Sequence, residues 1–117
     1  MLKYHNLLKR KLLPMTRKRI KVSTEEHLSE LHSKKKTGTF SILYTSLWDD
    51  KCTALSARVD KWLEREGDEL LYEINSWDSP AAFSMFMIMN VPALVLITKG
   101  RVRVRVEYPT VYRYFDE

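Results

Sequence analysis

The stretch from residue 40 to residue 66 constrains the fold most strongly, because it joins a buried strand pattern to a helix pattern through one short turn. Residues 40–44 (FSILY) form an apolar run of strand length. Residues 50–66 repeat apolar side chains at helical spacing, namely Leu55, Val59, Trp62 and Leu63. The turn between them, residues 46–52, leads onto the start of the helix, where free backbone N–H groups favour an anion or a thiolate.

The rest of the chain continues this alternation of strands and helices. Further strands are predicted at 19–22, 69–74, 93–97 and 101–106, and further helices after residue 23 and from residue 78. Lys99-Gly100 predicts a hairpin turn between the last two strands, and the end of the chain has room for one or two helical turns. The order β-α-β-α-β-α-β-β is typical of the α/β class.

Two helix starts are indicated by particular residues. Ser23 is predicted as a cap, with Glu26 three residues later completing a capping box. Pro80 after Asp78-Ser79 is suited to the first position of a helix.

Charge is distributed unevenly along the chain. The net charge is +5, yet residues 1–22 carry eight basic residues and no acid, so the remaining residues carry −3. The basic character therefore belongs to the N-terminal segment, and the pI of 9.4 does not make the folded part a nucleic-acid binder.

The domain boundary is expected between residues 18 and 19, with a basic arm at 1–18 and one domain at 19–117. Three interpretations of the arm stay open: a mitochondrial targeting segment, an arm that docks on an acidic or RNA surface, and a tail. The chain has too few consecutive apolar residues for a membrane span. Its single cysteine excludes an internal disulfide, so an intracellular, by default cytoplasmic, location is expected.

The order of elements and four local motifs resemble the thioredoxin-like superfamily. Trp48 matches the tryptophan before the family's Cys-x-x-Cys, and Asp49-Asp50-Lys51-Cys52 occupies that motif. Pro92, preceded by Val91, matches the family's cis-proline, and Lys99-Gly100 matches its last turn. The resemblance covers about residues 19–106 and implies a central mixed sheet flanked by helices, a final β-hairpin, and a C-terminal helix that is short or absent.

The departures from the family pattern bear on function. Asp49 stands where the resemblance implies the nucleophilic cysteine, and Cys52 matches only the second, resolving cysteine. The family's buried carboxylate falls on Leu43, its helix-kinking proline on Ala57, and the glycine opposite the cis-proline near Tyr108. The nucleophile and its acid–base support are thus missing together, while Asp49 and Asp50 suit the first turn of a capped helix.

Two surfaces are predicted to bind a partner. The resemblance implies an apolar surface around the motif, made here of Trp48, Met89, Val91, Pro92 and Tyr108. Arg101, Arg103 and Arg105 alternate with valines, which predicts an arginine face on an edge strand. That face suits RNA phosphates or an acidic protein surface, although charges on an edge also discourage unwanted pairing. No metal site and no cofactor are expected, because neither histidine near residue 30 has ligands at suitable spacing.

Two functional hypotheses follow. In the first, the protein is a redox-inactive adapter or structural subunit that binds a protein or ribonucleoprotein partner. A thioredoxin-like spliceosomal protein resembles it in carrying Trp-Asp-x-x-Cys, the pattern of Trp48, Asp49 and Cys52. In the alternative, it is a single-thiol oxidoreductase or redox sensor that uses Cys52. The missing nucleophile favours the first.

Overall fold

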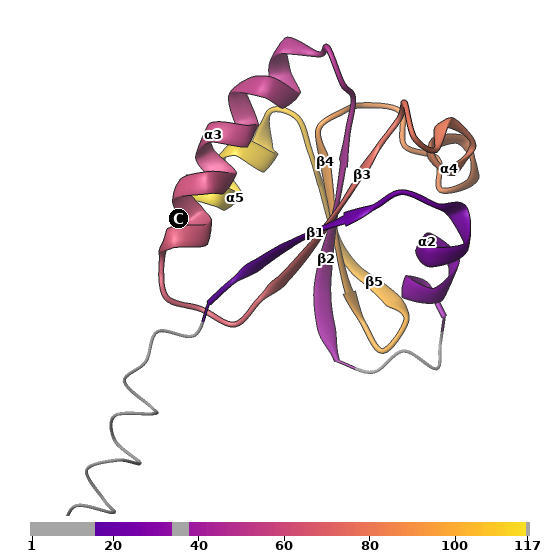
Figure 1. Cartoon of the computed structure of the whole chain (residues 1–117), viewed down its shortest axis with the longest axis horizontal. Helices are drawn as coiled ribbons and strands as arrows, with labels where there is room; N and C mark the ends of the chain where they lie inside the picture. The colour runs from indigo at the N-terminus through magenta and orange to yellow at the C-terminus, as the bar shows by residue number, and fades with distance from the viewer. Residues whose placement is uncertain (1–15, 34–37, 117) are drawn as a thin grey trace, which may run out of the picture.

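A five-stranded sheet lies between two layers of helices in the computed structural model, which describes residues 16–33 and 38–116 (Figure 1). Helices α3 and α5 cover one face of the sheet, and α2 and α4 cover the other. The strands are β1 (Lys18–Val22), β2 (Thr39–Thr45), β3 (Leu70–Asn75), β4 (Ala93–Thr98) and β5 (Arg101–Glu107). The helices are α2 (Glu25–Leu31), α3 (Asp50–Glu64), α4 (Pro80–Met85) and α5 (Thr110–Asp116).

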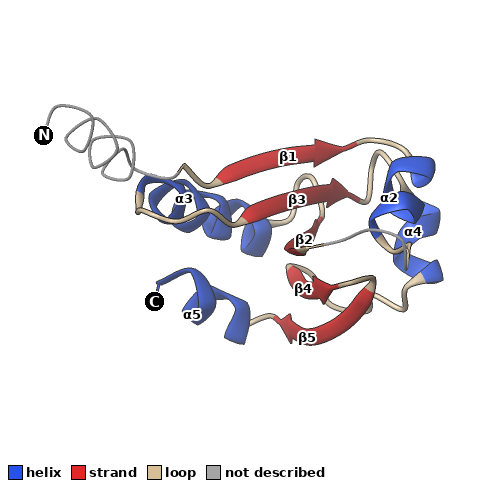
Figure 2. Cartoon of the chain, turned by 90° about the horizontal axis from the view of Figure 1, so that it is seen from below, coloured by secondary structure: helices blue, strands red, loops and turns tan. Residues whose placement is uncertain are grey.

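The strand order is β1-β3-β2-β4-β5, as Figure 2 shows along the sheet. β3 runs parallel to both β1 and β2, whereas β4 runs antiparallel to β2 and β5. The mixed sheet, the final hairpin and the short last helix confirm the predicted architecture. Because β2 is central, the turn that follows it lies at the middle of one end of the sheet.

Alternation along β2 sends neighbouring side chains into separate cores. Ile42 and Tyr44 pack toward α2 and α4, with Val95 and Ile97 of β4. Leu43 packs toward α3 and α5, in a cluster that also contains Leu55, Val59, Trp62, Leu71, Leu94, Val111 and Phe115. These contacts hold α3 against this face of the sheet.

The first strand begins inside the segment that was expected to be an arm. β1 starts at Lys18, and Arg17 donates a hydrogen bond to the Trp62 carbonyl at 2.9 Å and pairs with Glu69 at 2.8 Å. Residues 17 and 18 thus belong to the folded part, while residues 1–15 of the expected arm lie outside the described residues.

The predicted cap at Ser23 is wrong by one position. Thr24 is the N-cap of α2, and its hydroxyl accepts a hydrogen bond from the His27 N–H at 3.1 Å. The hydroxyl groups of Ser23 and Thr24 both suit this role. Thr24 is the cap because its backbone is extended immediately before Glu25, the first residue of the helix.

The predicted arginine face of β5 is also wrong. The β4–β5 register shifts between Leu96 and Ile97, so that Val104 pairs with Leu96 while Val102 pairs with Ile97. This bulge inserts one residue, Arg103, and interrupts the alternation. Val102 consequently lies on the α2/α4 face and Val104 on the α3/α5 face, and Arg101 and Arg105 likewise lie on opposite faces.

Within residues 16–33 and 38–116, no helix has the length and apolar character to cross a membrane. The same residues contain no cluster of three or more His, Cys, Asp or Glu side chains arranged to hold a metal ion.

Candidate functional site

The turn after β2 exposes Trp48. The residue is 83% exposed and has a φ of 75°. A bulky side chain rarely adopts this left-handed conformation, because its Cβ approaches the backbone too closely. The turn is fixed by bonds on either side of Trp48: the Asp49 N–H donates to the Ser46 carbonyl at 3.2 Å, and the Ser76 hydroxyl bonds to that of Ser46 at 3.0 Å.

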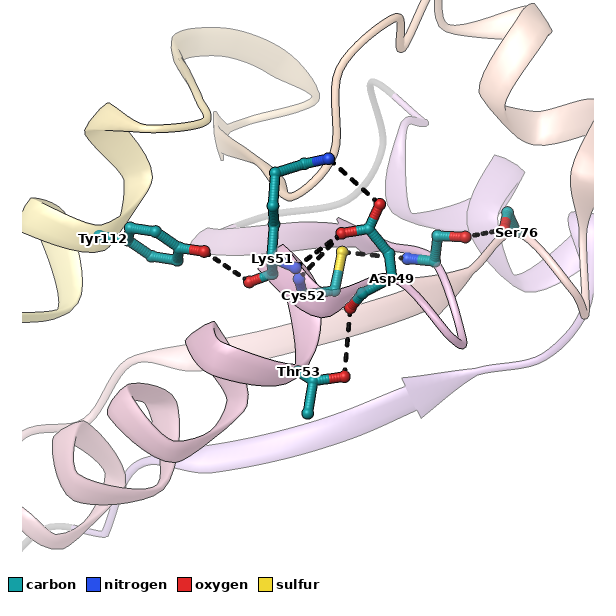
Figure 3. Close-up of polar contacts among 7 residues, drawn as sticks. Asp49, Lys51, Cys52, Thr53, Ser76 and Tyr112 are labelled. Atoms are coloured by element: carbon teal, nitrogen blue, oxygen red, sulfur yellow. Dashed lines mark hydrogen bonds and ion pairs between the residues drawn. The ribbon is translucent and has the colours of Figure 1, made fainter.

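Asp49 caps α3, as the sequence predicted. Its Oδ1 accepts hydrogen bonds from the N–H groups of Lys51 at 2.9 Å and Cys52 at 3.2 Å (Figure 3). Partial burial opposes ionisation of the carboxyl, but the bond from Cys52 and those from the Lys51 side chain and amide outweigh it and lower the pKa of Asp49. Asp50 is exposed and makes no contact of this kind.

Lys51 connects the start of α3 to the C-terminal helix. Its ammonium group lies 3.3 Å from Asp49 Oδ2 and 5.5 Å from the centre of the Tyr108 ring. Its carbonyl accepts a hydrogen bond from the Tyr112 hydroxyl at 2.7 Å (Figure 3). Asp49 and Lys51 are therefore both held by contacts within the chain itself.

Cys52 faces inward and is poorly suited to nucleophilic attack. The residue is 6% exposed, and its sulfur accepts a hydrogen bond from the Ser46 N–H at 3.3 Å. Burial raises the pKa of the thiol to about 11, despite that hydrogen bond and the helix start. At neutral pH the thiol is therefore almost entirely protonated, and the reactive thiolate form is scarce.

The position beneath the motif carries no acid. Leu43 is buried there, and it pairs across the sheet with Glu73 of β3. Glu73 is held by the Arg19 guanidinium through two hydrogen bonds of 2.8 and 2.9 Å, so it is engaged in an ion pair. Sequence reasoning missed this pair because its two members are far apart in the chain.

A cavity of about 510 Å³ opens between the turn and the β1 edge of the sheet. Cys52 and Glu73 both line it, together with Arg19, Lys21 and Trp48. Its two cations are already matched, Arg19 by Glu73 and Asp60 and Lys21 by Asp78 at 3.5 Å. The cavity thus offers a ligand no unmatched cation.

The expected apolar surface is only partly exposed. Met89 is 83% exposed and Tyr108 is 40% exposed, whereas Val91 is half-buried and Pro92 is buried. The peptide bond before Pro92 is cis. The Pro92 side chain therefore lies beneath the surface rather than on it.

Trp77 is a surface residue that the sequence analysis missed. It is 74% exposed in the loop after β3, and its backbone N–H donates a hydrogen bond to Asn75 Oδ1 at 2.8 Å. Strands β2 and β3 are parallel and paired from Ser41–Leu71 to Thr45–Asn75, so their following loops emerge at the same end of the sheet. Six large apolar side chains are exposed in the described segments that emerge at this end: Leu47, Trp48, Trp77, Met87, Met89 and Tyr108.

The three arginines of β5 have different surroundings. Arg105 bonds to Glu107 at 3.0 Å and donates to the Phe86 and Met87 carbonyls. The side chains of Arg101 and Arg103 are exposed and make no hydrogen bond or ion pair with another described residue.

Comparison with solved structures shows the thioredoxin fold. Thioredoxin from Trypanosoma brucei brucei matches with a TM-score of 0.73 at 10% identity, over 85% of this chain and 86% of that chain. Thioredoxin from Fasciola hepatica matches with a TM-score of 0.68 at 15% identity, over 81% of this chain and 93% of that chain. Mitochondrial thioredoxin 3 from Saccharomyces cerevisiae matches with a TM-score of 0.67 at 16% identity, over 81% of this chain and 90% of that chain. No protein-family model and no curated protein sequence matches this chain.

Proposed function

We propose that this protein is a redox-inactive module of the thioredoxin fold that holds a protein partner at the end of the sheet carrying Trp48. The observation that carries the proposal is the capped turn. Asp49 occupies the position of the implied nucleophile and satisfies the backbone N–H groups of Lys51 and Cys52. The site that would stabilise a thiolate is therefore filled by a carboxylate of the chain itself.

The remaining thiol supports the same proposal. Cys52 is buried with a pKa of about 11, so it is a weak nucleophile and a poor leaving group for disulfide exchange. Asp49 carries no sulfur, so Cys52 has no thiol at that position with which to form a disulfide.

The exposed apolar side chains support a binding role. Trp48, Trp77 and Met89 are each more than 70% exposed, and they belong to three different loops. Large apolar groups gathered at one end of a molecule are typical of an interaction surface, and tryptophan and methionine are enriched in such surfaces. We therefore expect the partner to cover Trp48 and Met89, together with Trp77 at the same end of the sheet.

The redox part is tested by insulin reduction with dithiothreitol, using the wild-type chain and Cys52→Ser. We expect both to give the uncatalysed rate. Catalysis by the wild type that Cys52→Ser abolishes would establish the single-thiol alternative instead.

The binding part is tested by affinity purification of the tagged full-length chain from its own cells, followed by reconstitution with the purified partner. We expect Trp48→Ala/Met89→Ala to weaken the complex by about tenfold or more, a loss of roughly 1.4 kcal/mol or more. Lys61→Ala, an exposed change on α3, is the matched control and should bind normally. A chain lacking residues 1–15 tests separately whether the basic segment contributes. Equal affinity of the double variant and the wild type would refute the proposed surface.

A further inference from the structure

The outer edge of β5 is a second surface whose character differs from the Trp48 end. β5 is the last strand in the sheet order, and no described strand pairs with its outer side. Backbone N–H and C=O groups on such an edge can hydrogen-bond to an added strand. Figure 2 shows β5 at the border of the sheet, with α5 extending away from it.

The first half of β5 combines apolar side chains with free cations. Val102 is 54% exposed and Val104 is 46% exposed, on either side of the bulge at Arg103. Arg101 and Arg103 are their neighbours in sequence, and the side chains of both arginines have no partner among the described residues. Arg105, in contrast, is engaged with Glu107 and the carbonyls after α4.

This segment is distant from the proposed partner surface. Arg101 pairs with Thr98, which pairs with Thr39 at the beginning of β2. Trp48 follows the other end of β2, after Thr45. The two surfaces therefore lie toward opposite ends of the sheet, and the inference below goes beyond the proposed function.

We infer that the outer edge of β5 between Arg101 and Val104 binds an extended acidic segment of a partner protein by strand addition. The added strand would hydrogen-bond to the β5 backbone. Its Asp or Glu side chains would pair with Arg101 and Arg103, and its apolar side chains would cover Val102 on one face of the sheet and Val104 on the other.

Charge decides between this occupant and a second copy of the chain. An antiparallel pair of β5 strands centred on Arg103 would place Arg103 opposite Arg103 and Arg101 opposite Arg105. Like charges directly opposite each other destabilise a strand pair. In this register the arginines disfavour a second copy of the chain, whereas an acidic strand gains from the same charges.

RNA fits the observations less well. Phosphates would pair with Arg101 and Arg103, but they would leave the two exposed valines and the unpaired backbone edge without a role. The bulge also places Arg101 and Arg105 on opposite faces, so the strand presents no single row of cations.

The test measures binding of a fluorescein-labelled peptide to the full-length chain. Glu-Glu and Val-Val pairs alternate in this peptide, so that each face of the extended strand carries both residue types. We expect Arg101→Glu/Arg103→Glu to weaken binding by about tenfold or more. Lys61→Glu/Arg113→Glu changes the charge equally at exposed positions of α3 and α5 and should leave binding unchanged. Binding should also slow amide hydrogen exchange in β5. N-methylation of the peptide backbone should abolish the binding.

Several outcomes would overturn the inference. These are no binding of the alternating peptide, equal loss in both charge-reversed variants, unchanged binding of the N-methylated peptide, and tighter binding of an oligouridine that the peptide cannot displace. Sedimentation showing a dimer of the wild type that Val104→Arg dissociates would assign the edge to a second copy.

Discussion

Asp49 changes the chemistry of the turn without removing its geometry. Its carboxylate accepts bonds from the amides of Lys51 and Cys52, and the helix that follows begins normally at Asp50. An N-cap carboxylate near the positive end of the helix dipole is favourable at neutral pH. The residue therefore contributes to stability at a position that the resemblance assigns to reactivity.

We expect Asp49→Ala to lower the free energy of unfolding by about 1 kcal/mol, because two helical N–H groups lose their acceptor. Asp50→Ala is the control, since Asp50 is exposed and makes no cap bond. Urea denaturation of both variants checks this, and equal losses would contradict the assigned cap.

The cap also predicts a pH dependence. The pKa of Asp49 is lower in the folded chain than its usual 3.8, so the unfolded chain takes up the proton first as the pH falls. The contribution is complete above that usual value and is lost as the pH decreases through the folded pKa. The stability difference between the wild type and Asp49→Asn should therefore shrink below about pH 4; a constant difference from pH 7 to pH 2 would contradict it.

Cys52 predicts a loss of stability at alkaline pH. The folded pKa is about 11, above the usual 9.0, so the unfolded thiol ionises first and stability falls as the pH rises between these values. At pH 8, iodoacetamide should label Cys52 at least about tenfold more slowly in the native chain than in urea. Mass spectrometry measures this rate, and native labelling at the unfolded rate would show an accessible thiolate.

At the scale of elements, the Arg19 network joins β1 to the middle of the domain. Arg19 bonds to Glu73 of β3 and also to Asp60 and Ser56 of α3, at 2.9 and 3.1 Å. One side chain thus fixes an edge strand to its neighbour and to the longest helix. Because the pair is partly exposed, its contribution is smaller than that of a fully buried ion pair.

Arg19→Met should destabilise the fold by roughly 1–3 kcal/mol, since it leaves the partly buried Glu73 carboxylate without its partner. A double-mutant cycle with Glu73→Gln isolates the pair. The double variant should lose less stability than the two single changes combined, whereas simple additivity would show that the pair contributes nothing.

The strands were predictable because their apolar runs are long and are separated by clear turns. The hairpin at Lys99-Gly100 was predictable too, and both residues have positive φ values, 52° and 76°. The bulge at Arg103 was not, because a sequence that alternates strictly gives no sign of an inserted residue. The choice of Thr24 over Ser23 likewise depends on backbone direction, which neighbouring hydroxyl residues do not reveal.

The site was partly predictable for a similar reason. Trp48, Asp49 and Cys52 are neighbours in the chain, so their order indicated a capped turn with an isolated thiol. Trp77 reaches the same end of the sheet only through the parallel pairing of β2 with β3. The burial of Pro92 and the Arg19–Glu73 pair are also products of tertiary packing.

For the whole molecule, the three tryptophans divide into two environments. Trp48 and Trp77 are exposed at one end, whereas Trp62 is 4% exposed and is covered by Phe115 and the Arg17 guanidinium. The molecule therefore contains an internal fluorescence reference beside two reporters on the proposed surface.

We expect acrylamide to quench most of the wild-type tryptophan emission, because two of the three indoles are exposed. Trp48→Phe/Trp77→Phe should emit at shorter wavelength and resist quenching. A bound partner should protect the wild type in the same way. Strong quenching of the double variant would contradict the buried position of Trp62.

The left-handed backbone at Trp48 has a consequence for how this protein responds to mutation. A glycine would adopt that conformation with less strain, so Trp48→Gly offers a gain in stability at the cost of the most exposed aromatic side chain at this end of the sheet. Selection for thermostability alone would favour this change, and selection for association would oppose it. Keeping tryptophan here therefore makes the turn a point where folding and recognition place opposite demands on the same residue.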